Sequence, residues 1–455
     1  MAVEIVILAA GEGTRMRSER PKVLQPLAGR PLLDHVVDAA EATGCEAIHV
    51  VYGFGGDEVQ SAMGGRALHW AHQAEQLGTG HAVAQALPGI SDDAIVVVAY
   101  GDVPLILPET LRRLAASASP DALAILTATF ENPTGYGRIV RDSGGRVIRI
   151  VEQKDATPEE LEIREGNTGL VAAPAVRLRD WLGRIGNDNA QGEYYLTDIV
   201  ALAVSDGVAV FGETAGSVAE VSGINDRVQL AAAEASLRER RCTELMHLGA
   251  ILADPGRVDI RGQVTCGRDV FIDVGVVFEG RVELGDRVNI GPYCVIRESI
   301  LEAGTEVLPH SLIDQSHAGP GCNIGPFARL RPGTRLAAKA KVGNFVEIKN
   351  AELGEGSKAN HLSYVGDTTV GREVNIGAGT ITCNYDGANK HRTVIGDGAF
   401  IGSGVELVAP VEVGEGATVG AGSTLGKDAP AGELTVARAR QVTVRGWKRP
   451  VKKKT

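Results

Sequence analysis

Hydrophobic residues in the first half of the chain gather in short runs separated by stretches of helical periodicity. Continuous apolar runs cover Val3 to Ala10, Ala47 to Tyr52, Ala94 to Tyr100 and Ala122 to Phe130. Runs of this length are typical of buried strands, and a helical pattern such as Leu32 to Thr43 lies between them. The alternation predicts an α/β domain with a mostly parallel, Rossmann-like sheet covered by helices on both faces. Ligands of such sheets bind beyond the carboxyl ends of the strands.

The pattern changes at residue 228. Residues 228–248 contain neither Gly nor Pro and are rich in strong helix formers. Gly249 and the following Asp254-Pro-Gly turn end this segment. We therefore predict a first domain at 1–227, a linker helix at 228–248 and a second domain at 249–455.

Beyond the predicted helix, aliphatic residues return at every sixth position. The spacing is strict at Val258, Val264, Val270, Val276, Val282 and Val288. It continues loosely through Ile300, Leu312 and Ile324, and it returns from Ile395 to Leu425. A period of six fits neither a helix nor an amphipathic strand, but it is typical of a β-solenoid in which the aliphatic residue points inward. Three hexapeptides to a coil give about nine coils for this segment.

One polar segment interrupts the repeat. The interval from Ile376 to Ile395 is one residue longer than three hexapeptides, and it contains the polar run Cys383 to Thr393. Polar excursions from a rigid repeat are where functional loops tend to lie. A plain structural insertion would produce the same interval, so both interpretations stay open.

Composition and charge narrow the class of protein. The chain has 58 glycines among 455 residues and only 4% aromatic residues, which suits thin aliphatic core layers. A net charge of −11 argues against a general nucleic-acid binder, because phosphate neutralisation needs a basic surface. No apolar run approaches the ~20 residues of a membrane span, and the start of the chain has no basic segment typical of a signal peptide. We expect a cytoplasmic protein that binds neither nucleic acid nor membrane, with a solvated basic tail from Lys448 to Thr455. The six cysteines form no C-x-x-C pair, which disfavours structural zinc and disulfides.

A glycine-rich turn follows the first predicted strand. Its sequence is Leu8-Ala-Ala-Gly-Glu-Gly-Thr-Arg-Met16, which matches neither the dinucleotide fingerprint nor the P-loop. Exposed N–H groups together with the cations Arg15 and Lys22 suit a nucleoside triphosphate. Asp102 follows the strand that ends at Tyr100 and offers a hard oxygen ligand to Mg²⁺, although a structural turn would also explain an aspartate there.

The solenoid carries its own candidate chemistry. Arg331 and Lys349 are separated by three hexapeptides, so on a coil of that length they share one face and make a phosphate pocket plausible. His361 lies two hexapeptides further on. Imidazole titrates near pH ~6.5, which suits a general base that takes a proton from an amine.

Together these motifs resemble one enzyme family over essentially the whole chain. It is the bifunctional family with N-acetylglucosamine-1-phosphate uridylyltransferase and glucosamine-1-phosphate acetyltransferase activities. The resemblance rests on Gly11-x-Gly-Thr-Arg-Met, Pro21-Lys-x-Leu, His72-Gln-Ala-Glu-Gln-Leu-Gly-Thr-Gly, Tyr100-Gly-Asp, Gly135-Tyr-Gly-Arg, Val151-Glu, Asn167-Thr-Gly, Gly223-Ile-Asn and the hexapeptide repeat. It implies a left-handed parallel β-helix, a homotrimer with shared acetyltransferase sites, Mg²⁺ as the metal, and UTP and acetyl-CoA as co-substrates. The implied product is UDP-N-acetylglucosamine.

The same resemblance assigns roles to individual residues. It implies that His361 is the catalytic base, with Glu347 as a possible partner, and that Asp102 and Asn225 hold the metal. For UTP and the UDP-sugar it implies Leu8, Ala9, Ala10, Gly11, Gly13, Arg15, Lys22, Gln73, Gly78, Thr79, Tyr100, Gly101, Gly137, Glu152, Asn167 and Asn225. For the glucosamine phosphate it implies Arg331, Lys349, Tyr364 and Asn375. For acetyl-CoA it implies Ala378, Asn384, Tyr385, Ser403, Ala421 and Arg438.

Two other interpretations of the solenoid remain open at this point. The chain could be a nucleotidyltransferase with a single activity and a structural or regulatory β-helix. Alternatively, the solenoid could hold a metal, as in hexapeptide-repeat carbonic anhydrases, through His310, His317, His361 or His391. The histidine spacing does not favour the second interpretation, because no close H-x₃₋₅-H pair is present.

Overall fold

The computed structural model describes residues 1–452, and its chain divides into two compact units between Leu237 and Arg238. The division falls inside helix α9 (Arg227–Leu248), which begins one residue before the predicted linker helix. Residues 453–455, the end of the basic tail, lie outside the described residues. No helix within the described part of the chain is long and apolar enough to cross a membrane.

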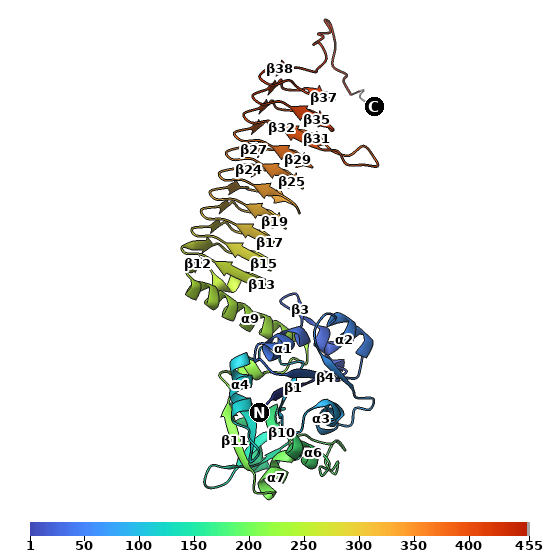
Figure 1. Cartoon of the computed structure of the whole chain (residues 1–455), viewed down its shortest axis with the longest axis vertical. Coiled ribbons are helices and arrows are strands. Elements are labelled where there is room, and N and C mark those ends of the chain that lie inside the picture. Colours follow the sequence, from blue (N-terminus) through green and yellow to red (C-terminus); the bar gives the residue numbers. More distant parts are fainter. Residues whose placement is uncertain (453–455) are drawn as a thin grey trace. The chain divides into compact units, whose positions relative to one another are not determined.

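The first unit is built on one mixed β-sheet (Figure 1). Its strands follow the order β11-β7-β10-β6-β1-β4-β5, with β8 and β9 attached beside β10. The four predicted strands end within two residues of their expected bounds and become β1, β4, β6 and β7. The strands are β1 (Val3–Leu8), β4 (Ala47–Tyr52), β5 (His69–His72), β6 (Ile95–Tyr100), β7 (Ala122–Thr129), β8 (Arg138–Arg141), β9 (Val147–Val151), β10 (Glu165–Pro174) and β11 (Ala209–Thr214), with a separate small hairpin of β2 (Pro26–Leu27) and β3 (Arg30–Pro31).

Strand β10 was not predicted, and it makes the sheet less parallel than expected. It runs antiparallel to both β6 and β7. Its register against β7 shifts between Asn167 and Val171, where Gly169 adopts a φ of +88°. This left-handed glycine is typical of a bulge, which bends a strand and redirects its side chains. The strands β6, β1, β4 and β5 pair in parallel with one another, as the alternation of runs predicts.

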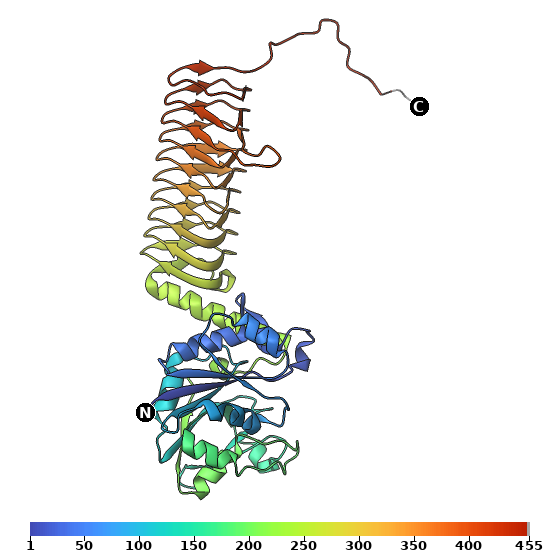
Figure 2. The same ribbon diagram turned by 45° about the vertical axis from the view of Figure 1, so that its right-hand side comes forward.

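Helices cover both faces of this sheet (Figure 2), as predicted. Successive residues of a strand point to opposite faces, so Ile5 and Ile7 pack with α1, α2 and α4, whereas Val6 and Leu8 pack with α3, α6 and α7. The helices are α1 (Leu32–Glu41), α2 (Gly56–Ala62), α3 (Thr79–Ala86), α4 (Pro108–Ala116), α5 (Pro158–Leu161), α6 (Ala175–Leu182), α7 (Asp198–Ser205) and α8 (Val218–Val221), and the 3-10 turns are η1 (Thr14–Met16), η2 (Lys22–Leu24) and η3 (Leu87–Gly89). Two-sided burial explains why the strands are continuous apolar runs.

The second unit is a parallel β-helix, as the six-residue period predicts. Over the described residues, one side is an 11-stranded sheet, and the other two sides belong to a 16-stranded sheet that forks after β17. The first side contains β12 (Ala250–Leu252), β14 (Val270–Ile272), β16 (Asn289–Ile290), β18 (Glu306–Val307), β21 (Asn323–Ile324), β24 (Lys341–Asn344), β27 (Lys358–His361), β30 (Asn375–Ile376), β33 (Phe400–Ile401), β36 (Thr418–Val419) and β38 (Leu434–Thr435).

The forked sheet supplies the second and third sides. Three longer strands begin it: β13 (Asp259–Cys266), after the turn η4 (Pro255–Arg257), β15 (Val277–Leu284) and β17 (Val295–Leu301). The second side continues with β19 (Leu312–Asp314), β22 (Arg329–Leu330), β25 (Glu347–Lys349), β28 (Tyr364–Gly366), β31 (Ile381–Cys383), β34 (Glu406–Val408) and β37 (Thr424–Leu425). The third side continues with β20 (His317–Ala318), β23 (Arg335–Leu336), β26 (Glu352–Leu353), β29 (Thr368–Val370), β32 (Thr393–Ile395) and β35 (Val411–Val413).

Some coils in the middle of the β-helix are one residue shorter than three hexapeptides. Val277 pairs with Val295, a full three hexapeptides later, but Val282 pairs with Ser299, which is one residue short of that interval. A shift of one residue sends a side chain to the opposite face of a strand. Ile300 is accordingly 40% exposed, and its neighbour Leu301 is fully buried. The predicted inward direction is therefore wrong at Ile300, and the same shift leaves Leu312 only half-buried.

The polar interruption is an insertion into one coil, a position that agrees with either interpretation of the polar run. Val370 pairs with Ile395, which is a longer step along the chain than the step from Leu353 to its own partner Val370. The additional residues form a hairpin between β31 and β32 that projects from the β-helix (Figure 1). Tyr385 and Lys390 pair across this hairpin. We call residues 384–392 the hairpin below.

The coil register generates a prediction about stability. Replacing Leu301 with Ala removes a fully buried side chain, so we expect the free energy of unfolding to fall by about 3 kcal/mol. The neighbouring change Ile300→Ala is the matched control and should cost about 1 kcal/mol or less, because that side chain points outward. Urea denaturation of the full chain measures both. Equal losses, or a larger loss at Ile300, would show that the structural register is wrong.

Candidate functional site

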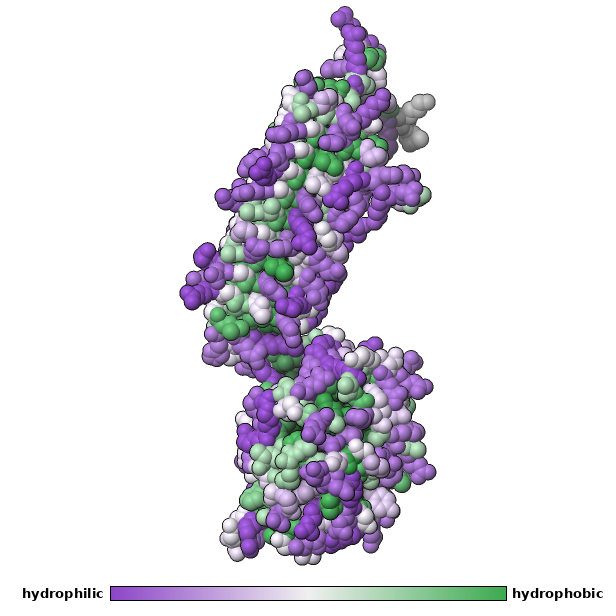
Figure 3. Space-filling view, in the orientation of Figure 1, coloured by the Kyte–Doolittle hydropathy of each residue, from purple (hydrophilic) through white to green (hydrophobic). Residues whose placement is uncertain are grey.

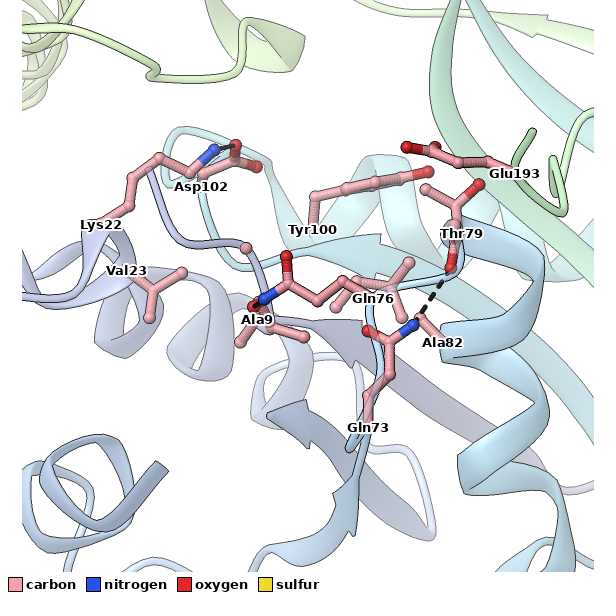
Figure 4. A pocket seen from close by; sticks show the side chains of 14 residues that line it. Ala9, Lys22, Val23, Gln73, Gln76, Thr79, Ala82, Tyr100, Asp102 and Glu193 are labelled. Atoms are coloured by element: carbon pink, nitrogen blue, oxygen red, sulfur yellow. Dashed lines mark hydrogen bonds and ion pairs between the residues drawn. The ribbon is translucent and has the colours of Figure 1, made fainter. Parts of the chain in front are cut away.

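A cavity of about 290 Å³ lies at the carboxyl ends of β1 and β6 in the first unit (Figure 4). This is the sheet edge at which the sequence predicts a ligand. Of the predicted residues, the cavity is lined by Leu8, Ala9, Ala10, Gly11, Lys22, Gln73, Gly78, Thr79, Tyr100 and Asp102. Residues from separate segments of the chain therefore converge on one site.

A cation and two oxygens meet at one end of this cavity. The Lys22 ammonium forms an ion pair with Asp102 and donates a hydrogen bond to Asn225 Oδ1 at 3.2 Å. Gly13 lies against the stem of the lysine: its φ is +68°, and a Cβ there would be 2.5 Å from Lys22 Cβ. Only glycine fits without displacing Lys22. A carboxylate and an amide oxygen that already face a cation are ligands that suit Mg²⁺.

The opposite end of the cavity is formed by amide side chains and a tight turn. Gln73 is buried and donates to the carbonyl of Gly78 at 3.2 Å, and Gln76 donates to the carbonyl of Ala10 at 2.8 Å. Gly78 has a φ of +111° and lies against the backbone of Tyr194. Amides fixed in this way provide donors and acceptors that can match the edge of a nucleobase.

Tyr100 connects this cavity to a second, smaller one. The second cavity is lined by Tyr100, Asn167 and Thr197, among others. Thr197 donates a hydrogen bond of 3.1 Å to Glu152 Oε1, and a Cβ on Gly137 would lie 3.4 Å from the same carboxylate. Burial raises the pKa of Glu152, and the Thr197 hydrogen bond opposes that shift. The residues predicted to hold the sugar therefore gather beside Tyr100.

Sequence reasoning missed part of the cavity and included residues that do not line it. The missed lining residues are Val23, Gln76, Ala82 and Glu193. Gln76 lies inside a motif that the resemblance uses, so a closer interpretation of that motif would have found it. Glu193 lies in an irregular polar segment with no periodic pattern. Among the predicted residues, Arg15 is exposed on η1, and Gly101 packs beneath the cavity against Leu33.

The second unit carries a cluster of cations. Arg329 pairs with Glu347 and Leu330 with Ile348, and this register places Arg331 and Lys349 on the same side of successive coils, as predicted. Lys390 reaches this pair from the hairpin, and its hydrogen bond and positive charge lower the pKa of Lys349, with Arg331 acting in the same direction. Like charges repel, so this cluster is suited to a phosphate that would relieve the repulsion. Lys390 was not predicted, although it lies in the polar run expected to be functional.

His361 ends β27 and is exposed. Its Nδ1 donates to Asn344 Oδ1 at 3.0 Å, and the two residues are paired in adjacent coils. An amide oxygen can only accept, so this contact favours the neutral tautomer with the proton on Nδ1, in which Nε2 carries the lone pair that a base requires. The suggested partner Glu347 instead accepts a hydrogen bond from Arg331 at 2.7 Å. Within one chain, Asn344 is therefore the group that contacts the His361 ring, and a role for Glu347 beside His361 stays a prediction.

The predicted sugar-phosphate residues divide between two sides of the β-helix. Asn375 begins β30 and lies with His361 on the first side, in the strand next to Lys358. Tyr364 begins β28 and lies with Lys349 on the second side. One chain thus presents these groups around a corner of the β-helix rather than in one pocket.

The predicted acetyl-CoA residues form a column at that corner in the following coils. The carbonyl of Ala378 accepts from Gly404 N at 2.7 Å, and that of Ser403 accepts from Gly422 N at 2.8 Å. Arg438 donates to the carbonyl of Ala421 at 2.7 Å. Small residues in consecutive coils leave a narrow surface that an extended ligand can follow.

The two hairpin residues predicted for acetyl-CoA differ in their exposure. Tyr385 is exposed. Asn384 is buried, and its side-chain amide donates to Asp367. One N–H of the Asn384 amide is therefore engaged inside the protein, and the role of this residue in acetyl-CoA binding stays a prediction.

The other histidines of the β-helix have separate partners. His310 stacks between Tyr293 and Phe327, with ring centroids 5.3 and 4.9 Å apart. His317 contacts Glu302 at 2.6 Å, and His391 contacts Asp386 at 2.7 Å. Among residues 1–452, no group of three or more His, Cys, Asp or Glu side chains is arranged to hold a metal. These contacts give the carbonic-anhydrase interpretation no support.

Comparison with known proteins also assigns the two units of the chain to different families. Residues 5–156 match the MobA-like NTP transferase domain family, and residues 263–298 and 392–427 match the bacterial transferase hexapeptide family. The chain is 57% identical to "Bifunctional protein GlmU" of Aromatoleum aromaticum over 99% of both chains. It is 58% identical to the protein of that name from Azoarcus sp. over 99% of this chain and 100% of that one. A solved nucleotidyl transferase from Methanothermobacter thermautotroptrophicus covers 51% of this chain and 96% of its own, with 24% identity and a TM-score of 0.38.

High identity over the full length of both partners shows the family directly. The two matched domain families occur in the order in which the nucleotide-type cavity and the β-helix occur along the chain. This chain belongs to the GlmU family of bifunctional enzymes, with a nucleotidyltransferase unit followed by a hexapeptide-repeat acetyltransferase unit.

Proposed function

We propose that the two sites described above perform the two successive steps of UDP-N-acetylglucosamine synthesis. The β-helix unit transfers an acetyl group from acetyl-CoA to glucosamine 1-phosphate. The first unit then transfers the uridylyl group of UTP to the resulting N-acetylglucosamine 1-phosphate and releases pyrophosphate. The observation that carries the proposal is the presence of two different phosphate-type sites on one chain, one around Lys22 and the other where the coil register brings Arg331 beside Lys349.

Uridylyl transfer needs alignment and charge compensation rather than a protein nucleophile. A phosphate oxygen of the sugar 1-phosphate attacks the α-phosphorus of UTP, and the bond to the pyrophosphate oxygen breaks. The amides of Gln73 and Gln76 hold the uracil end, and Glu152 and Asn167 hold the sugar hydroxyls, so the reacting atoms meet beside Tyr100. Lys22 offsets the repulsion between the two anions. Orientation of this kind lowers the barrier by removing the entropy cost of the encounter.

Asp102 and Asn225 are the residues that would hold Mg²⁺ in this unit. Their oxygens converge on the Lys22 ammonium, so the positions already accommodate a positive charge. Two protein ligands are typical for Mg²⁺, which completes its coordination with phosphate and water. When bound, the ion neutralises phosphate charge.

Acetyl transfer requires a base. His361 Nε2 takes a proton from the sugar amine while the amine nitrogen bonds to the thioester carbonyl carbon, and the carbon–sulfur bond to CoA then breaks. Asn344 keeps the ring in the tautomer that can accept the proton. Arg331, Lys349 and Lys390 bind the phosphate of the substrate. The column of Ala378, Ser403 and Ala421 supports acetyl-CoA.

We also propose that the enzyme is a homotrimer that acts in the cytoplasm. The sugar-phosphate residues lie on two sides of one β-helix, so a second copy is needed to enclose the substrate. An exposed aromatic stack of Tyr293, His310, Phe327 and Phe345 runs along the corner that leads to His361. Figure 3 shows hydrophobic areas exposed on the second unit. Burial of such a surface between copies would be favourable.

Separate sites should be separable by mutation. We expect His361→Ala to lower kcat for acetyl transfer by about 10²–10⁴-fold, the usual contribution of a positioned base, and to leave uridylyl transfer within about twofold. Asp102→Asn should do the reverse, because it removes a charged metal ligand from the other unit. Release of CoA and of pyrophosphate are measured separately for each variant. Loss of both activities in either folded variant would contradict two independent sites, and intact acetyl transfer in His361→Ala would show that His361 is not the base.

The environment of Glu152 predicts a shift in pH dependence. Burial already raises the pKa of this carboxyl, and the Thr197 hydrogen bond stabilises its charged form. In Thr197→Val that bond is lost, so the pKa rises further and the carboxylate is protonated at a higher pH. We expect the acidic limb of kcat/KM for N-acetylglucosamine 1-phosphate to move to higher pH.

A threonine elsewhere in the unit provides the control. Thr43→Val removes a hydroxyl that donates to the carbonyl of Ala40. The acidic limb of kcat/KM in this variant should lie at the same pH as in the unmodified enzyme. If Thr197→Val also leaves the limb unmoved, or moves it downward, Glu152 is not the group that the profile reports.

A further inference from the structure

Asp367 is a buried carboxylate on the corner that follows β28. Its φ is +48°, and its side chain is almost completely inaccessible to solvent. The residue one coil earlier at this corner, Asn350, has a φ of +47°, and Gly333, one coil before that, has a φ of +81°. A carboxylate is costly to bury unless donors surround it. Glycine also fits at this corner, so backbone geometry alone does not explain why a carboxylate is buried there.

Both oxygens of the Asp367 carboxylate accept from side-chain amides. Asn350 Nδ2 donates to Oδ1 at 2.5 Å, and Asn384 Nδ2 donates to Oδ2. Asn350 belongs to the preceding coil, and Asn384 is the first residue of the hairpin. Hydrogen bonds to an ionised acceptor are stronger than those between neutral groups, so this carboxylate ties the coil to the hairpin.

The backbone of Asp367 makes two further links at the same place. Its N–H donates to the carbonyl of Lys349 at 3.0 Å, and its carbonyl accepts from Thr393 N at 3.2 Å. Asn384 and Thr393 are where the hairpin leaves and rejoins the β-helix. One residue therefore connects the strand of Lys349 to both ends of the hairpin.

The hairpin beyond these two ends is held together by its own contacts. Tyr385 pairs with Lys390, and Asp386 accepts from His391 and from the backbone of Asn389. Because it is internally braced, its position relative to the coils is set at its ends. Its cation Lys390 lies beside Lys349, and the repulsion between these two ammonium groups favours separation of the hairpin from the coil.

We propose that Asp367 is a positioning residue of the acetyltransferase site, which holds the hairpin so that Lys390 stays beside Lys349 and the phosphate finds a preformed cluster of cations. The inference rests on the proposed acetyl transfer. Because the phosphate takes no part in bond making or breaking during acetyl transfer, loss of the positioning weakens binding of the substrate more than it slows the chemical step.

The most direct test is Asp367→Gly, since a glycine already occupies this corner at position 333 and tolerates a positive φ. We expect KM for glucosamine 1-phosphate to rise about tenfold, the effect of losing one charge-assisted hydrogen bond, and kcat to change less than about threefold. Trypsin should cut faster after Lys390, because the hairpin opens more often. Asp367→Asn keeps one acceptor oxygen but loses the charge and the second acceptor, so its KM and cleavage rate should lie between those of the unmodified enzyme and of Asp367→Gly.

Gln315→Gly is the matched control. Gln315 is exposed at the same corner three coils earlier, with a φ of +45°, and its replacement leaves both hydrogen bonds of the Asp367 carboxylate in place, so KM and the cleavage rate should stay within about twofold of the unmodified enzyme. Equal effects of Gln315→Gly and Asp367→Gly would show a merely structural role and overturn the inference, as would unchanged KM and cleavage in Asp367→Gly. If the unmodified enzyme released no CoA at all, the proposed function would fail instead, and the cleavage rates would still decide whether Asp367 holds the hairpin.

Discussion

Parallel hydrogen bonding between strand backbones is the interaction on which both units depend. In the first unit it brings the carboxyl ends of β1 and β6 to one edge, where residues from distant segments meet around Lys22 and Asp102. In the second unit it stacks each coil on the one before, so that Arg331 and Lys349 come together although a whole coil of sequence separates them. Side chains that carry chemistry need only occur at the right phase of the repeat, because the pairing itself supplies their positions.

Charged side chains in close contact distinguish the two sites from the framework around them. Lys22 is held by two oxygens, and the absence of a Cβ at Gly13 leaves the space that its stem occupies. Lys349 is held close to another ammonium, and the amide-bound carboxylate of Asp367 lies at the next corner. Both arrangements are prepared for anionic phosphate before a substrate arrives. Preparation of this kind is what an enzyme needs when the reaction itself requires no protein nucleophile in either unit.

Much of the fold could be predicted from the sequence because its patterns are periodic. The strands β1, β4, β6 and β7 are continuous apolar runs, and the six-residue period has one physical explanation. The period cannot reveal a coil one residue shorter, so Ile300 was assigned inward although Leu301 is the buried residue. It is also the same for either hand of coil, so the left-handed sense came from the resemblance alone. Strand β10 was missed because its bulge at Gly169 breaks any simple alternation.

The candidate sites were predictable where motifs adjoin strands, and less so where loops supply the groups. Residues such as Ala10 and Asp102 follow strands directly, and the structure places them in one cavity. Glu193 and Lys390 come from irregular segments, whose path depends on tertiary contacts that no local pattern encodes. The contact between His361 and Asn344 was missed for a related reason, because it depends on the register between coils.

The central claim is that one chain performs both steps in order, and omission of single reactants tests it most directly. Supplied with glucosamine 1-phosphate, acetyl-CoA, UTP and Mg²⁺, the unmodified enzyme should release CoA and pyrophosphate and form UDP-N-acetylglucosamine. Without UTP, CoA release should continue while pyrophosphate release stops. Without acetyl-CoA, both should stop, and added N-acetylglucosamine 1-phosphate should restore pyrophosphate alone. Pyrophosphate formed equally fast without acetyl-CoA or the acetylated sugar would contradict this order of steps, and no CoA release under any condition would contradict the second activity.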